Sequence, residues 1–110
     1  MTRPEIDWKL AIERAGGQEA LATDLHAMLL AELPGHIEVL DQALASTDRR
    51  HLADPVHRVT GSCRYCGVPR LEAAAEALNA RLKAGDNPPD DAIEPVIEAA
   101  RALLHEQDSA

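Results

Sequence analysis

The sequence predicts an all-α domain, folded as an antiparallel four-helix bundle with a short extra helix at its N-terminus. Ala and Leu dominate the 110 residues and both favour helix, whereas the chain has no Phe, one Tyr and one Trp. Val, Ile and Thr are scattered, with no alternating run that would predict a strand. Apolar residues instead recur at helical spacing in four long segments joined by short loops, which is typical of a bundle.

The first two helices are predicted over about residues 7–15 and 18–45. Asp7 is a suitable N-cap for the short first helix, and the glycine pair that follows Ala15 is a suitable stop. Apolar residues of the second segment are expected to share one face; these are Leu21, Leu25, Met28, Leu29, Leu33, Ile37, Leu40 and Leu44. Pro34 precedes a glycine inside this segment, so we expect a kink or a break there.

The third helix is predicted after a turn and N-cap at residues 46–48. Its core positions alternate by four and three residues; these are Leu52, Val56, Val59, Cys63 and Cys66. Pro55 removes one backbone donor near its beginning, which either starts the regular helix or kinks it. Gly67 is expected to end this helix, and Pro69 suits the first turn of the next one.

The fourth and fifth helices follow the same logic. The fourth is expected to turn Leu71, Ala75, Leu78 and Leu82 inward, and a loop over residues 85–90 is rich in Gly, Asn and Pro. The fifth is expected to bury Ile93, Val96, Ile97, Ala100, Leu103 and Leu104, before a polar, frayed tail. Length and the absence of repeats predict a single domain over residues 1–110, with a core at about 5–105.

Net charge and hydropathy exclude some classes of binding partner for this chain. The formal net charge is −8, which argues against general binding to nucleic acid or to anionic membranes. No apolar stretch approaches the ~20 residues of a membrane span, and the N-terminus lacks the apolar region of a signal peptide. We therefore expect a cytoplasmic protein that neither binds nucleic acid nor inserts into a membrane.

His57 has an unusual setting on the third helix. Val56 and Val59 are predicted core residues, so His57, about 100° further round the helix than Val56, lies at the edge of that stripe or outside it. Gly61 lies one turn later on the same side, although glycine within a helix costs about 1 kcal/mol relative to alanine. The missing side chain would let another protein approach the imidazole closely.

The alternative to a functional role is that His57 is an ordinary surface histidine beside an incidental glycine, or that Gly61 is required by tight packing between helices. The remaining histidines have no comparable setting, and we expect no functional role for them; these are His26, His36, His51 and His105.

Two strings of residues resemble a known family. "HRVTGS" (57–62) and "GVPRL" (67–71), with the opening "IDWKLAIERAGG" (6–17), resemble the histidine phosphotransfer (HPt) domain, in the form attached to hybrid sensor kinases of the GacS and BarA type. The resemblance spans roughly residues 5–105. It implies a phosphocarrier of a bacterial multistep phosphorelay, in which His57 accepts a phosphoryl group from a receiver-domain aspartate and passes it to another receiver.

The resemblance also assigns roles to neighbouring residues. Many members carry Lys or Arg where this chain has Thr60, so Arg58 and Arg64 are expected to supply positive charge instead. Asn79 matches a polar position on the facing helix that holds the imidazole, and Lys83 would add charge to the same groove. Arg58, Thr60, Gly61, Arg64, Asn79 and Lys83 are thus the expected residues for receiver docking and for support of the imidazole and phosphate.

The resemblance implies no autonomous kinase activity and no cofactor on this chain. Mg²⁺ is expected on the partner receiver, which supplies most of the charge stabilisation in phosphoryl transfer. The expected partners are response-regulator receiver domains and a hybrid sensor kinase, and we expect the chain itself to be a monomer. The alternative is a receiver-docking helical module that carries no phosphate.

The two cysteines allow a third, metal or thiol, interpretation. Cys63 and Cys66 form a C-x-x-C pair, but a zinc site needs about four ligands and no second pair of suitable residues is present. A thioredoxin-like motif would need a βαβ context, which the sequence does not predict. Because both cysteines continue the apolar stripe of the third helix, we expect buried structural residues and no metal site.

Overall fold

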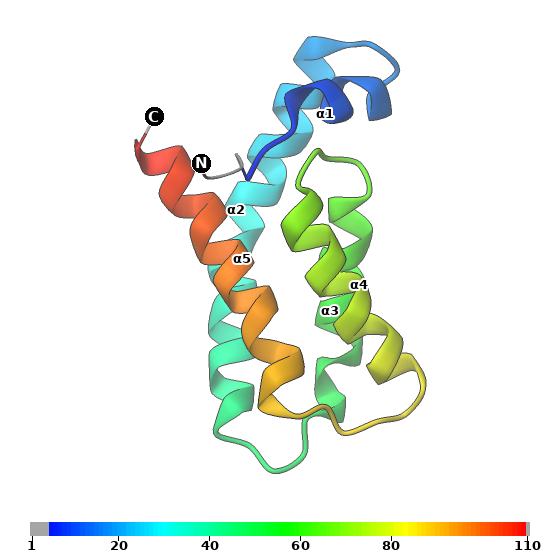
Figure 1. Ribbon diagram of the computed structural model, residues 1–110, viewed down its shortest axis with the longest axis vertical. Helices are drawn as coiled ribbons and strands as arrows, with labels where there is room; N and C mark the ends of the chain where they lie inside the picture. The colour runs from blue at the N-terminus through cyan, green and yellow to red at the C-terminus, as the bar shows by residue number, and fades with distance from the viewer. Residues whose placement is uncertain (1–4, 110) are drawn as a thin grey trace.

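Five α-helices and one short 3₁₀ helix make up the structure, a computed structural model that describes residues 5–109 (Figure 1). The α-helices are α1 (Trp8–Arg14), α2 (Glu19–Leu44), α3 (Ala53–Cys63), α4 (Pro69–Lys83) and α5 (Asp90–Ser109), and the 3₁₀ helix η1 (Arg50–Leu52) precedes α3. No strand occurs among the described residues, which confirms the predicted all-α class.

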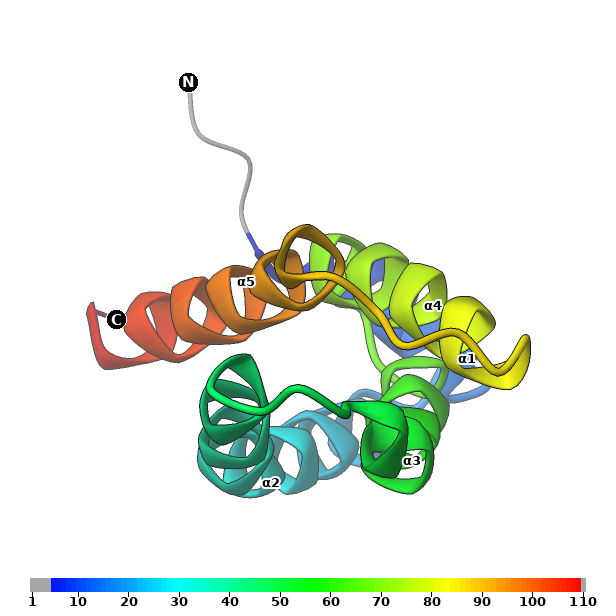
Figure 2. The ribbon, with the colours of Figure 1, turned by 90° about the horizontal axis from the view of Figure 1, so that it is seen from below.

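Helices α2 to α5 form the bundle, and each runs antiparallel to the next (Figure 1). Viewed from below, α2, α3, α4 and α5 follow one another around a common centre, so that α3 and α5 lie diagonally opposite (Figure 2). Their inward faces bury large apolar side chains, among them Leu29, Leu33, Leu52, Leu71, Leu78, Ile93 and Leu103. The predicted bundle is therefore confirmed, and burial of this apolar surface is its main source of stability.

Helix α2 continues through Pro34 as one helix, so of the predicted kink or break the break is wrong. A proline removes one backbone donor, but α2 has 26 residues and keeps buried leucines on both sides of this point, Leu33 and Leu40. Packing thus outweighs one lost hydrogen bond. Two residues expected to face inward are instead exposed, Leu21 by 39% and Met28 by 62%.

Helix α3 begins later and ends earlier than predicted, because the 3₁₀ helix η1 follows the turn at residues 46–48 and precedes it. Pro55 lies in its first turn, where a backbone N–H has no partner within the helix, so this proline starts the helix at no cost in hydrogen bonds. The helix ends at Cys63, and Cys66 and Gly67 belong to the loop before α4. Pro69 is the first residue of α4, as predicted.

Helix α1 packs across the N-terminal half of α2 and against the α3–α4 loop (Figure 1). The Asp7 carboxylate accepts a hydrogen bond from the Leu10 backbone at 3.1 Å, which confirms the predicted cap. Gly67 has no side chain because α1 approaches it closely: the Asp7 N–H donates to the Gly67 carbonyl at 2.7 Å. A Cβ on Gly67 would lie 2.8 Å from the Ala11 nitrogen.

Arg49 ties the opposite end of the bundle together. Its guanidinium donates to the carbonyls of Ala43 and Leu44 at 3.1 Å, which satisfies acceptors at the end of α2. It also donates to the Pro88 carbonyl at 3.1 Å and pairs with the Asp90 carboxylate at 2.6 Å. One side chain therefore joins the end of α2 to the start of α5. That last helix extends to Ser109, beyond the point where fraying was predicted.

Candidate functional site

His57 lies on the outer surface of α3. Its neighbours Val56 and Val59 are 1% and 2% exposed and belong to the core, whereas His57 and Arg58 are exposed. The imidazole is therefore open to another molecule, as the periodicity of this helix predicted.

Gly61, one turn beyond His57, borders open space. A Cβ built on this glycine would meet no atom within 4 Å outside its own helix backbone. The alternative in which close packing between helices requires a glycine here is therefore wrong. Next to the imidazole, position 61 therefore presents backbone without a side chain.

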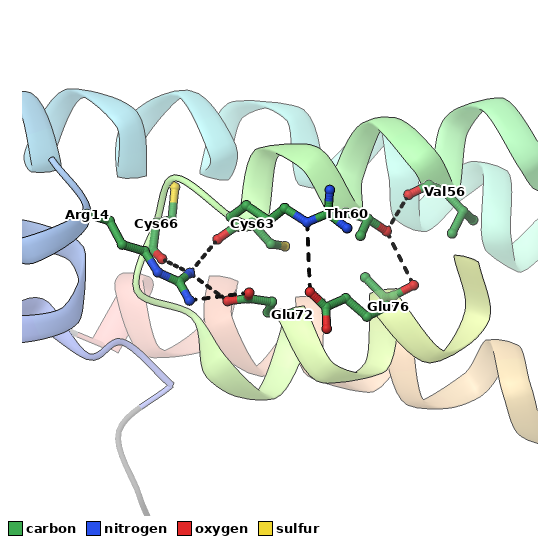
Figure 3. Close-up of polar contacts among 9 residues, drawn as sticks. Arg14, Val56, Thr60, Cys63, Cys66, Glu72 and Glu76 are labelled. Carbon is green, nitrogen blue, oxygen red and sulfur yellow. Dashed lines mark hydrogen bonds and ion pairs between the residues drawn. The ribbon is translucent and has the colours of Figure 1, made fainter. Parts of the chain in front are cut away.

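Thr60 differs from its predicted role. Its side chain is buried, with 1% of the residue exposed, and its hydroxyl donates to the Val56 carbonyl at 2.7 Å within α3. The same oxygen lies 3.3 Å from the Ala75 carbonyl on α4 (Figure 3). Thr60 therefore links α3 to α4 from inside, and it does not contribute to the exposed strip around His57.

Asn79 and Lys83 lie along the neighbouring face of α4. Helices α3 and α4 are antiparallel, and Thr60 contacts Ala75. The helical turn that precedes Thr60 in α3 therefore lies beside the turn that follows Ala75 in α4. This places Asn79, which is 5% exposed, at the level of His57, although no hydrogen bond joins the two described side chains. Lys83 is exposed one turn further along α4.

Positive charge near His57 comes from two exposed arginines, Arg58 in α3 and Arg64 directly after it. The Arg64 Nε lies 3.8 Å from the Glu76 carboxylate of α4, and both side chains are about half exposed. Such an exposed pair contributes little to stability, so Arg64 can exchange its partner at low cost. Arg58 lies on the other side of α3, toward α2.

A shallow groove between α2 and α3 is a feature that the sequence analysis missed. It has a volume of about 360 Å³ and is lined by Glu32, Gly35, His36, Val39, Pro55 and Arg58. Burial lowers the pKa of His36, while Glu32 opposes and Arg58 adds to this shift. The adjacent Pro34 and Gly35 were the available signal, because a glycine on the α2 surface leaves room there.

Cys63 and Cys66 are structural, as predicted. Both are buried, and burial raises the pKa of the Cys63 thiol to about 12 and also raises that of Cys66. Arg14 donates to the carbonyls of Cys63 and Cys66 at 3.2 and 2.8 Å and pairs with Glu72 at 2.7 Å (Figure 3). The described residues contain no cluster of three His, Cys, Asp or Glu residues that could hold a metal ion.

Comparisons with known proteins connect this geometry to one family. The family model for the Hpt domain matches residues 24–108. The signal transduction histidine-protein kinase BarA of Shigella flexneri is 35% identical over 104 residues, which cover 94% of this chain and 11% of that protein. The sensor histidine kinase GacS of Pseudomonas protegens is 40% identical over 91 residues, which cover 76% of this chain and 10% of that protein.

A solved structure agrees with the fold. The chain matches the HPT domain of a Shewanella Hpt sensor hybrid histidine kinase with a TM-score of 0.87 and 23% identity, over 96% of this chain and 92% of that one. The curated relatives are much longer, since the chain spans 11% of the BarA sequence that it matches. On the strength of the family match, the kinase relatives and the helical fold, this chain belongs to the Hpt domain family.

Proposed function

We propose that the chain is a histidine phosphocarrier of a multistep phosphorelay, with His57 as the phosphoacceptor. The observation that carries this proposal is the exposed imidazole on α3 beside a turn without a side chain, in a chain that belongs to the Hpt domain family. The charge and clearance around His57 suit a partner protein that brings the phosphoryl group to it.

The transfer itself needs only one nucleophilic atom from this chain. In the proposed step, the lone pair of the neutral His57 Nε2 attacks the phosphorus of an aspartyl phosphate on a receiver domain. The bond between phosphorus and the aspartyl oxygen breaks, and its electron pair leaves with the aspartate carboxylate. The proton on Nδ1 stays on the ring during this step and then exchanges with water. Transfer to a second receiver reverses the sequence.

The catalytic charge stabilisation comes from the partner. Phosphoryl transfer depends mainly on positioning and electrostatics, and a receiver would supply Mg²⁺ from its own acidic site. In this proposal the chain exposes His57 and holds Asn79 beside it at the same height along the bundle. The positive charges of Arg58, Arg64 and Lys83 would attract the incoming phosphate or the acidic receiver surface. It would have no kinase activity of its own.

Receiver domains, and a hybrid sensor kinase of the BarA and GacS type, are the proposed partners. No helix among the described residues has the length and apolar character to cross a membrane. We place the proposed activity in the cytoplasm and expect the carrier to act as a monomer.

A phosphotransfer assay tests the proposal. The chain is incubated with a receiver domain that carries ³²P on its aspartate, and we expect acid-labile, base-stable label on the chain. His57→Gln should abolish labelling with almost unchanged thermal stability, because exposed substitutions usually change it by less than about 0.5 kcal/mol. The matched control is His51→Gln, another exposed histidine, which should be labelled normally.

The same assay identifies the alternative function. Label that persists in His57→Gln would move the phosphoacceptor to another residue and would refute the assignment. A chain that binds the receiver without ever acquiring label would instead be a docking module.

A further inference from the structure

His26 of α2 is a buried histidine that the proposed function does not use. The residue is 4% exposed, and neither Nδ1 nor Nε2 has a hydrogen-bond partner in the part of the chain that the structure describes. A neutral imidazole has one donor and one acceptor, and leaving both unpaired in the interior is unfavourable. Adding a proton there would bury an unpaired charge, which is more unfavourable still.

Trp8 of α1 covers this imidazole. The two rings meet edge to face, with centroids 5.0 Å apart and planes inclined by 61°. Trp8 is itself 42% exposed, so it borders both the imidazole and solvent. Movement of Trp8 would therefore give a protonated His26 access to water on this side.

Helix α1 packs outside the main core. It has seven residues, and its buried Ala11, with Ala15 directly after the helix and Ala22 of α2, forms a small cluster separate from the main core. An apolar cluster of this size holds a helix weakly, and such elements open locally at a lower free energy than the whole domain. The other attachments of α1 are the Asp7–Gly67 backbone hydrogen bond and the contacts of Arg14 with the Cys63 and Cys66 carbonyls and Glu72. The site is thus a short helix, held outside the main core, over a histidine that resists protonation.

The charged surroundings of His26 do not offset its burial. Burial lowers the pKa of His26, and Glu106 of α5 is the charged group that acts in the opposite direction. That carboxylate already accepts a hydrogen bond from the Glu5 backbone at 2.6 Å. From the side of α1, the group that faces His26 is the uncharged indole of Trp8, and the Asp7 carboxylate is occupied by the Leu10 backbone.

We propose that α1 is a pH-sensitive latch, closed over neutral His26 and opened locally when His26 takes up a proton. The direction follows from linkage. The folded pKa of His26 lies below its ordinary value of about 6.5, so the closed latch binds fewer protons than the open one between the two pKa values. Closure is strongest above about pH 6.5 and weakens as the pH falls through that interval.

Opening would also loosen the end of α3. Arg14, the last residue of α1, donates to the carbonyls of Cys63 and Cys66 at that end. Displacement of α1 removes this guanidinium, so the C-terminal carbonyls of α3 lose a cationic donor. The latch therefore connects protonation of His26 in α2 to α3, the helix that carries His57.

Fluorescence of Trp8, the single tryptophan of the chain, tests the latch. The 110-residue chain is titrated from about pH 8 to about pH 5, the range in which histidine changes charge. We expect the emission maximum to move to longer wavelength, and quenching by acrylamide to roughly double, because the closed indole is 42% exposed. Circular dichroism should keep most of its helical signal, since the bundle core stays closed.

His26→Phe separates the latch from other titrations. It keeps an aromatic ring under Trp8 without a titratable group, so the transition should disappear, whereas His51→Gln should titrate like the wild type. Unchanged acrylamide access in the wild type, or an unchanged transition in His26→Phe, would refute the proposal. So would loss of helical signal throughout the chain at the same midpoint. If His26→Phe does not fold, imidazole ¹⁵N NMR of the wild type decides: the midpoints of His26 and Trp8 must coincide, and different midpoints refute the latch.

Discussion

The hydroxyl oxygen of Thr60 on α3 lies 3.3 Å from the carbonyl oxygen of Ala75 on α4, inside the bundle. This contact marks how the two helices are aligned, with His57 level with Asn79. Thr60→Val keeps the shape of the side chain but removes the hydroxyl. We expect unfolding in urea to show a loss of about 1 kcal/mol, with phosphotransfer retained.

Thr60→Ser is the matched control, because it restores the hydroxyl and loses one methyl group. If Thr60 instead contacted the phosphate, Thr60→Val would reduce transfer without reducing stability. That pattern would contradict the buried role of Thr60.

Gly67→Ala should detach α1 from the α3–α4 loop. The added Cβ would lie 2.8 Å from the Ala11 nitrogen and would also clash with the Asp7 carbonyl, and both are backbone atoms that cannot turn aside. We expect a loss of about 2 kcal/mol, typical of overpacking, together with a red-shifted Trp8 emission. Gly35→Ala is the control, since its Cβ meets nothing within 4 Å and should leave Trp8 unchanged.

Cys63 and Cys66 should be unreactive in the folded chain. Because burial raises the pKa of Cys63 to about 12 and raises that of Cys66, both are thiols at neutral pH, and neither is accessible to Ellman's reagent. We expect both thiols to react with Ellman's reagent only after the chain is denatured. Changing both to Ala should cost on the order of 1 kcal/mol or more and preserve phosphotransfer. A double variant that is stable but inactive in phosphotransfer would show that the two cysteines have a chemical role.

The exposed arginines Arg58 and Arg64 should increase the rate of encounter with an acidic receiver. Changing both Arg58 and Arg64 to Glu should slow label transfer at low salt, and the penalty should shrink as salt screens the charges. Arg101→Glu, on the diagonally opposite helix α5, is the net-charge control for Arg58→Glu and Arg64→Glu tested singly (Figure 2). Equal rates for the arginine variants and the wild type at low salt would show that Arg58 and Arg64 do not guide docking.

The helices were predictable because their periodicity and boundaries are local properties of the sequence. Apolar residues three and four apart located the bundle faces, and Gly and Pro located most of the loops. The continuity of α2 through Pro34 was not predictable in this way, because it depends on packing that outweighs one missing hydrogen bond.

Residues whose environment depends on a neighbouring helix were placed less well. The burial of Thr60 requires the alignment of α4, and the burial of His26 requires α1 to fold back over α2. Leu21 and Met28 looked apolar enough for the core, yet the inward face of α2 turned out to be centred on other residues. The exposure of His57, by contrast, followed from the position of Val56 and Val59 on its own helix.

Gly61 tests whether clearance beside His57 matters for transfer. Its position borders open space, so Gly61→Ala should keep or raise stability by up to about 1 kcal/mol, with a modest loss of transfer. Gly61→Gln should fold as well as the wild type and transfer poorly, because its side chain would hold the receiver away from the about 3–3.5 Å that in-line attack requires. Thermal melts and transfer assays with one receiver measure both properties. A stable Gly61→Gln protein that transfers at the wild-type rate would refute the clearance argument.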